Sequence, residues 1–199
     1  MAQHLPYLRG DGVAIREPMR DDAETLFGWS GEAGVERWNP FDTPQNVADV
    51  RRMIDQFREY RATDLMYVFA IEDGRSGEVA GLTWLSAMVP PHRAEMGTWL
   101  GRSYWGTGIY RESKRLILPF AFDAIGVRRV EARIAKANVQ AQRAFAALGA
   151  VREGVLRDGW VLRDGRVVDQ YLYTLLAKDY WEKFPNEKAK LRAMRDESE

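Results

Sequence analysis

Residues 99–110 read WLGRSYWGTGIY and join a predicted strand to a predicted helix. Gly106 and Gly108 let the backbone approach a ligand closely, because glycine carries no Cβ. The main-chain N–H groups that follow have no partners inside the helix, and the positive end of the helix dipole lies beside them. Such a helix start can hold a pyrophosphate. A tight turn that binds nothing explains the two glycines equally well.

Two common phosphate-binding loops do not fit this segment. The dinucleotide-binding fingerprint needs a third glycine, and Arg111 stands at the corresponding position. A Walker loop needs a Gly-Lys pair followed by Ser or Thr, which this segment lacks. If the loop holds an anion, it therefore belongs to another kind of site.

Apolar periodicity on both sides of this loop indicates strands and helices. Residues 94–100 read as a strand that returns antiparallel from residues 79–88 through Pro90-Pro91. Residues 109–125 read as a helix, which Pro119 should kink because it removes a backbone hydrogen bond. The other expected elements are a strand at 13–16, helices at 23–27 and 45–61, a strand at 66–71, a strand at 130–135, a helix at 139–148, strands at 150–162 and 167–176, and a last helix capped by Asp179.

The order of these elements predicts a mixed α/β sheet that is antiparallel in its early strands and contains a crossover in its middle. It is not the regular strand–helix alternation of a Rossmann domain. The length of 199 residues fits one domain, which we expect to span residues 1–182. A charged helical tail is expected at residues 183–199.

Composition argues against several classes of function. The 29 Lys and Arg residues balance 29 Asp and Glu residues, and zero net charge argues against a protein that coats nucleic acid. The chain has no cysteine, and its two histidines, His4 and His92, are far apart in sequence, which argues against a thiol nucleophile, a zinc site and a Ser-His-Asp triad. No stretch has the ~20 apolar residues that cross a membrane. We therefore expect a soluble cytoplasmic protein with no metal and with no nucleic-acid or membrane partner.

Several motifs in the same order make the chain resemble the GNAT acetyltransferases, in particular the branch that contains ribosomal-protein N-terminal alanine acetyltransferases. The resemblance covers about residues 8–182. It implies a single mixed, largely antiparallel, splayed sheet of the α/β (α+β) class, with helices on both faces. The motifs are EMGTWL at 95–100, YWGTGI at 104–109, Glu112, Lys114, AF at 121–122, VE at 130–131, Asn138, RA at 143–144, LGA at 148–150, EGVLR at 153–157, DG at 164–165, Asp169 and Tyr173.

The resemblance also implies acetyl-CoA as cosubstrate. Its pantetheine arm would lie between two diverging strands, which here end at Leu100 and Ala135. Asn138 also reads as a helix cap, and Arg143 also reads as an exposed charge. The residues implied in binding are the main-chain N–H groups of Trp105, Gly106, Thr107, Gly108, Ile109 and Tyr110 for the pyrophosphate, the main chain of Trp99 and Leu100 with the amide of Asn138 for the arm, and Arg143 for a phosphate.

Two positions depart from the family pattern. Tyr110 replaces a residue that is usually small, or Asn in this branch, so its side chain either crowds the phosphates or points away. Ala141 stands where related enzymes often carry a serine that can protonate the departing thiolate, and alanine has no hydroxyl to do so.

Acetyl transfer needs a neutral amine and therefore a group that accepts its proton. Glu95 is the candidate base, because strand alternation puts it on the same face as Trp99, toward the expected gap. An ion pair with Arg93 or Arg133 is its alternative role. Tyr173 is a candidate acid or a lining residue of the amine pocket, and ordinary core packing explains it equally well.

The sequence is compatible with more than one kind of acceptor amine. Trp29, Trp38 and Trp84 are candidates for the acceptor pocket, with plain packing as the alternative. The resemblance favours the N-terminal α-amine of a protein or peptide. The alternatives are a small-molecule amine (an antibiotic, a polyamine or an amino acid) and a non-catalytic acyl-CoA-binding module. Aromatic residues on the last strands and Trp181 are compatible with a homodimer.

Overall fold

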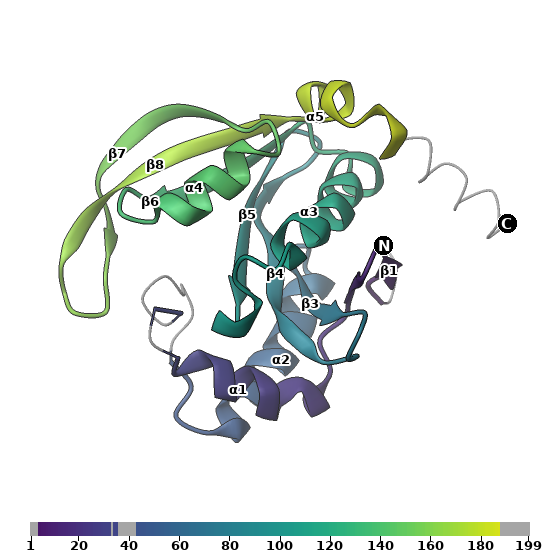
Figure 1. Ribbon diagram of the computed structural model, residues 1–199, viewed down its shortest axis with the longest axis vertical. Coiled ribbons are helices and arrows are strands. Elements are labelled where there is room, and N and C mark those ends of the chain that lie inside the picture. Colours follow the sequence, from purple (N-terminus) through teal and green to yellow (C-terminus); the bar gives the residue numbers. More distant parts are fainter. Residues whose placement is uncertain (1–3, 33, 36–42, 188–199) are drawn as a thin grey trace, which may run out of the picture.

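An eight-stranded sheet forms the centre of the structure (Figure 1). The computed structural model describes residues 4–32, 34–35 and 43–187. The spatial order is β1-β2-β3-β4-β5-β6-β8-β7, and every neighbouring pair is antiparallel except β5 and β6. The strands are β1 (Leu8–Arg9), β2 (Val13–Arg16), β3 (Met66–Asp73), β4 (Val79–Val89), β5 (Arg93–Leu100), β6 (Arg129–Ala135), β7 (Val151–Val161) and β8 (Val167–Leu176).

Helices cover both faces of this sheet (Figure 1). α1 (Ala23–Ser30) and α2 (Val47–Ala62) pack on one face. α3 (Ile109–Pro119), α4 (Val139–Ala146) and α5 (Ala177–Lys183) pack on the other. The expectation of a mixed, largely antiparallel sheet with helices on both faces is therefore confirmed.

The central strand β3 explains why two separate cores form. Tyr67, Phe69 and Ile71 point to the core beneath α3, whereas Val68 and Ala70 point to the core beneath α1 and α2. Successive side chains of a strand face opposite sides, so a strand covered on both faces must be apolar at every position. The uninterrupted apolar run at the start of β3 reflects this double burial.

β5 and β6 diverge soon after they meet. They pair in parallel at only three positions, from Arg93 to Glu95 on β5 and from Arg129 to Glu131 on β6. Beyond these positions β5 stays paired with β4 as far as Leu100, and β6 stays paired with β8. The expected splay is therefore present, and it begins directly after Glu95.

Two local predictions differ from the structure, and one short strand was not predicted. The helix expected over 109–125 divides into α3 and a π-helical turn at Phe120–Ile125, because Pro119 has no N–H to continue the α-helical ladder. The prediction that Asp179 caps the last helix was wrong: Leu176 occupies the cap position, and Asp179 lies in the first turn of α5. The short strand β1 was not predicted.

The end of the described chain packs against the rest of the fold. Glu187, which lies within the predicted tail, is buried and accepts hydrogen bonds from the Arg115 guanidinium and the Tyr180 hydroxyl. These contacts join the segment after α5 to α3. Among the described residues, no helix combines the length and the apolar character needed to cross a membrane.

Candidate active site

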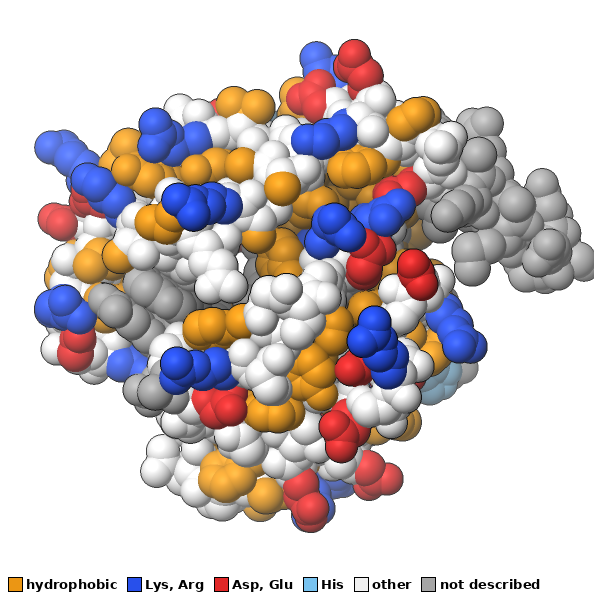
Figure 2. All heavy atoms as spheres, in the orientation of Figure 1, with side chains coloured by type: hydrophobic (Ala, Val, Ile, Leu, Met, Phe, Trp, Pro, Cys, Tyr) orange, Lys and Arg blue, Asp and Glu red, His pale blue; other side chains and the backbone are white. Residues whose placement is uncertain are grey.

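Two cavities of about 410 Å³ each adjoin where β5 and β6 diverge. The loop cavity lies against Gly106, Gly108 and α4, and the strand cavity lies against the facing parts of β5 and β6. Figure 2 shows a hollow with apolar walls in the middle of this face, between α4 and the start of α3. Thr98, Tyr110, Asn138 and Ala141 line both cavities.

The glycine loop presents an open helix start to the loop cavity. Gly106 and Gly108 have φ values of +77° and +94°, which L-residues with a side chain rarely adopt. A Cβ built on either glycine would meet no atom within 4 Å, so the space beside each is open. Gly108 caps α3 without a side-chain hydrogen bond, which leaves the N–H groups of the first helical turn available to an anion.

The backbone of β5 offers donors to the gap between the strands. The N–H of Gly101 donates to the carbonyl of Ala80, on the β4 side. Because alternate residues of a strand turn their main-chain groups to opposite sides, Thr98 and Leu100 direct theirs toward the gap. The indole of Trp105 donates to the carbonyl of Leu100 at 3.0 Å, in agreement with this direction. The main chain of Trp99 faces β4 instead.

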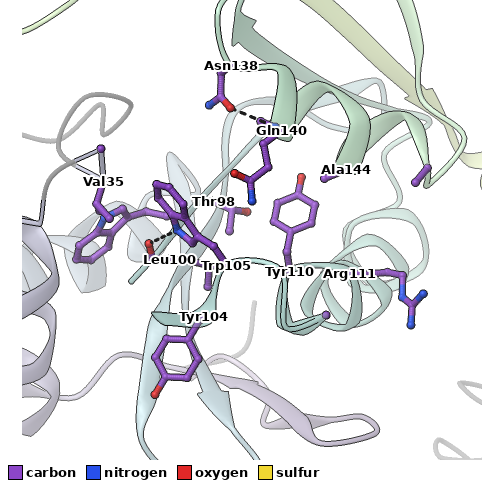
Figure 3. Close-up of a pocket in the computed structure, with 16 residues that line it drawn as sticks. Val35, Thr98, Leu100, Tyr104, Trp105, Tyr110, Arg111, Asn138, Gln140 and Ala144 are labelled. Carbon is purple, nitrogen blue, oxygen red and sulfur yellow. Dashed lines mark hydrogen bonds between the residues drawn. The ribbon is translucent and has the colours of Figure 1, made fainter. Parts of the chain in front are cut away.

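α4 forms the opposite wall of the loop cavity. The Asn138 side chain accepts a hydrogen bond from the Ala141 N–H at 3.1 Å and so caps this helix. Gln140 and Ala144 follow at helical spacing and line the cavity (Figure 3). Ala147, at the C-cap of α4, lines it as well. The small alanine side chains leave room for a ligand between α4 and α3.

Glu95 lies in the wall of the strand cavity, at the last paired position before the strands diverge. Its side chain is 27% exposed, and its Oε2 lies 3.5 Å from Nε of Arg133. Arg93, the other expected partner, approaches Glu131 instead. Glu95 is thus accessible from the cavity while its charge is partly balanced by one arginine.

Lys114 is buried completely beneath this site. Its Nζ donates to the hydroxyls of Thr83, at 2.6 Å, and Thr98, and it lies 5.0 Å from the ring centroid of Tyr110. Both threonine hydroxyls donate to the carbonyl of Gly97, so their oxygens are free to accept from the amine. Burial lowers the pKa of the Lys114 ammonium well below its usual range.

Comparison with known proteins shows the family to which the chain belongs. The sequence profile of the acetyltransferase (GNAT) domain matches residues 13–151, more than half of the chain. The chain belongs to the GNAT acetyltransferase family. It is an acetyl-CoA-dependent N-acetyltransferase.

Individual relatives agree with this membership along most of the chain. The uncharacterized N-acetyltransferase p20 of Bacillus licheniformis is 25% identical over 169 residues, which are 84% of this chain and 94% of p20. Ribosomal-protein-S5-alanine acetyltransferase from Vibrio fischeri has the same fold, with a TM-score of 0.77, 21% identity and coverage of 88% and 98%. Mycobacterium smegmatis RimJ in complex with CoA-disulfide gives a TM-score of 0.77 at 23% identity, with 87% of each chain covered.

The loop cavity of this acetyltransferase fits acetyl-CoA. The open glycine loop and first turn of α3 suit its pyrophosphate, and the diverging strands leave main-chain donors for an extended arm. Bound there, acetyl-CoA would supply an activated thioester whose acetyl group can pass to an amine. Thr98 and Leu100, rather than Trp99, direct N–H groups toward the gap in which that arm would lie.

The predicted binding residues do not all reach the cavities of this acetyltransferase. Ile109 is buried in the core beneath α3, and Thr107 directs its hydroxyl to the carbonyl of Tyr104, so neither side chain lines a cavity. The prediction for both residues concerns their main-chain N–H groups at the start of α3. Arg143 lies exposed on α4 and lines neither cavity. The residues that do line the loop cavity are Trp99, Leu100, Trp105, Gly106, Gly108, Tyr110 and Asn138.

The remaining candidates are divided between cavity and core. Trp84 lines the strand cavity together with Glu95. Tyr173 packs against Phe145 in the core and lines neither cavity. Trp29 donates to the carbonyl of Val79 and covers the main chain near Gly101, outside both cavities. Trp38 lies outside the described residues.

Sequence reasoning missed several residues of the site. Gln140, Ala144 and Ala147 recur at helical spacing after Asn138, and this pattern could have marked the cavity face of α4. Trp160 on β7 also lines the strand cavity, but it comes from a distant hairpin and carries no comparable signal.

Proposed function

We propose that this enzyme acetylates the N-terminal α-amine of a protein or peptide. The observation that carries the proposal is the meeting of two cavities at the strand divergence, with the carboxylate of Glu95 in the second of them. The name of the structural neighbour from Vibrio fischeri, a ribosomal-protein-S5-alanine acetyltransferase, supports this class of acceptor.

In this proposal the donor and the acceptor approach from opposite sides of the divergence. The glycine loop and α4 hold acetyl-CoA, and the strand cavity admits the amine. A free α-amine has a pKa of about 7.7–8.0, so a modest base can keep it neutral near physiological pH. Glu95 accepts its proton, directly or through one water. The N–H groups of Thr98 and Leu100 face the gap where negative charge develops on the thioester oxygen.

The charge of the strand cavity favours a peptide over a polycationic small molecule. Glu95 is the acidic residue among the described residues that line it, and Arg133 lies beside it. A polyamine or an aminoglycoside carries several positive charges and needs several carboxylates to balance them. A peptide N-terminus presents one amine, which one carboxylate can serve.

Release of free thiol from acetyl-CoA tests the proposal. The purified enzyme is offered peptides that begin with Ala, Ser, Met or Gly, and in parallel spermidine, an aminoglycoside and free amino acids. We expect release with at least one class of peptide and none when that peptide is blocked by N-terminal acetylation. If free thiol is released with a small amine but with none of the peptides, the acceptor is a small-molecule amine and not a peptide N-terminus. Saturable acetyl-CoA binding without release for any amine would support the non-catalytic alternative.

A further inference from the structure

Trp160 packs differently from the other tryptophans that the structure describes. The other five belong to one of the two cores or pack against one: Trp29, Trp84, Trp99, Trp105 and Trp181. Within the described part of the chain, Trp160 packs against neither core and lies half-buried in the wall of the strand cavity. A large aromatic side chain held at a cavity offers an apolar surface for binding.

A β-bulge in β7 brings Trp160 to this wall. Between Leu156 and Trp160, three residues of β7 lie opposite the single residue Asp169 of β8. In a regular ladder Asp158 would take the place of Trp160 opposite Val168. Bulges of this kind redirect side chains and are frequent next to active sites. The bulge therefore puts an aromatic side chain on the cavity wall where regular pairing would put a carboxylate.

Gln170 on β8 adds a polar group beside the bulge. The residue is only 3% exposed, yet it lines the strand cavity. Among the described residues its side-chain amide has no hydrogen-bond partner, which is unusual for a buried polar group. A Cβ built on Gly159 would lie 3.0 Å from Oε1 of Gln170, so the amide lies next to the residue that precedes Trp160. An amide both donates and accepts, and a peptide bond of a ligand can satisfy both functions.

Strand register connects Gln170 with Glu95. Gln170 pairs with Ala135 of β6, and Arg133 lies two residues earlier, on the same face of that strand. Arg133 forms the ion pair with Glu95 on β5. Three neighbouring strands thus carry the carboxylate, the guanidinium and the amide in succession along one cavity. An α-amine held at Glu95 has its own side chain and its first peptide bond inside this cavity.

We propose that Trp160 and Gln170 select the acceptor peptide by its first residue. The indole packs against the first side chain, and the amide pairs with the first peptide bond. The inference rests on the proposed function and deepens it by naming the acceptor class, a peptide that begins with an apolar residue. An acidic first residue is disfavoured, because Glu95 and the negative face of the indole both repel a carboxylate.

Peptides that differ only in their first residue test the role of Trp160. Peptides that begin with Leu, Gly or Asp are compared by thiol release from acetyl-CoA, as kcat/KM. For the unchanged enzyme we expect the Leu peptide to exceed the Gly peptide by about tenfold or more, because the leucine side chain is buried against the indole, and the Asp peptide to be the poorest. Trp160→Ala should lower the Leu to Gly ratio by about tenfold, since glycine has no side chain that loses the contact. Trp160→Phe keeps an aromatic face and should keep most of the preference.

Isopentylamine, which carries the leucine side chain without a peptide bond, tests the role of Gln170. The unchanged enzyme should acetylate it about tenfold less efficiently than the Leu peptide. Gln170→Met has a similar length but no amide. It should lower kcat/KM for the Leu peptide by about tenfold and leave that for isopentylamine unchanged. An equal loss with both amines would give Gln170 a purely structural role and contradict its part in the proposal.

Controls separate this inference from the proposed function. Val161→Ala changes an exposed neighbour of Trp160 that lines neither cavity, and it should leave every ratio unchanged. All variants should bind acetyl-CoA equally well, because neither Trp160 nor Gln170 lines the loop cavity. A Leu to Gly ratio that Trp160→Ala does not change overturns the inference and leaves the proposed function intact.

If no peptide is acetylated, the proposed function is wrong, and the inference is judged with small amines. Isopentylamine and methylamine carry the side chains of leucine and glycine. Their ratio, from thiol release or from calorimetry in the presence of CoA, should then fall in Trp160→Ala. An unchanged ratio would overturn the role of the indole as well.

Discussion

At the scale of single residues, Glu95 has the position expected of a base. It lies at the end of the β5–β6 pairing and lines the strand cavity. We predict that Glu95→Gln lowers kcat by about tenfold or more, because an amide cannot accept the proton of the amine. The affinity for acetyl-CoA, measured by calorimetry, should change little, because Glu95 does not line the loop cavity.

A matched substitution controls for a general effect of losing a carboxylate. Glu182→Gln changes an exposed residue of α5 and should leave kcat as it is. If Glu95→Gln is as active as the unchanged enzyme, Glu95 has no part in proton transfer, and its role is the ion pair with Arg133.

Lys114 gives a second residue-scale prediction, which concerns stability and pH. The unfolded chain holds the lysine proton up to about pH 10.4, whereas burial lowers the pKa in the folded chain. Between these two values the unfolded state binds more protons, so the free energy of unfolding rises with pH and falls as the pH drops. We predict that the free energy of unfolding of Lys114→Met does not show this increase with pH, because methionine has no group that titrates.

Urea unfolding from pH 7 to pH 10 measures the effect. The free energy of unfolding of the unchanged enzyme should increase across this range relative to that of Lys114→Met. If the free energy of unfolding depends on pH in the same way for both proteins, the buried amine of Lys114 does not release its proton on folding.

At the scale of elements, the start of α3 depends on one glycine, which adopts a positive φ and leaves the N–H groups of the first helical turn unobstructed. Gly108 has a φ of +94° and caps the helix whose N–H groups line the loop cavity. We predict that Gly108→Ala weakens acetyl-CoA binding by about tenfold or more, because alanine strains this backbone and shifts the N–H groups. Calorimetric titration with acetyl-CoA measures the loss.

The control is a glycine whose conformation alanine tolerates. Gly28 lies exposed inside α1, and a Cβ there would meet nothing within 4 Å. Gly28→Ala should leave binding unchanged and stabilise the fold by about 0.5–1 kcal/mol, because alanine favours helix interiors. If Gly108→Ala binds acetyl-CoA as well as Gly28→Ala does, the first turn of α3 is not the anion site.

At the scale of the whole molecule, the site depends on one interruption of the sheet. β5 and β6 are the parallel pair in an otherwise antiparallel sheet, and they stay paired for three positions. A continuous pairing would satisfy the backbone of both strands and close the gap. The divergence instead leaves main-chain donors of β5 facing a cavity. The residues that surround it come from distant parts of the chain, from Gly34 to Gln170.

Local pattern in the sequence determined most of the elements and the position of the glycine loop in this acetyltransferase. Two glycines between a strand and a helix, and apolar side chains at periods of two and 3.6, act over short distances and can be read directly. Only the tertiary structure decided that Tyr110 points into the cleft, that Tyr173 packs against Phe145, and that Lys114 is buried beneath Thr98. The direction and burial of a side chain depend on neighbours brought together by folding, and the spacing of residues along one chain does not contain that information.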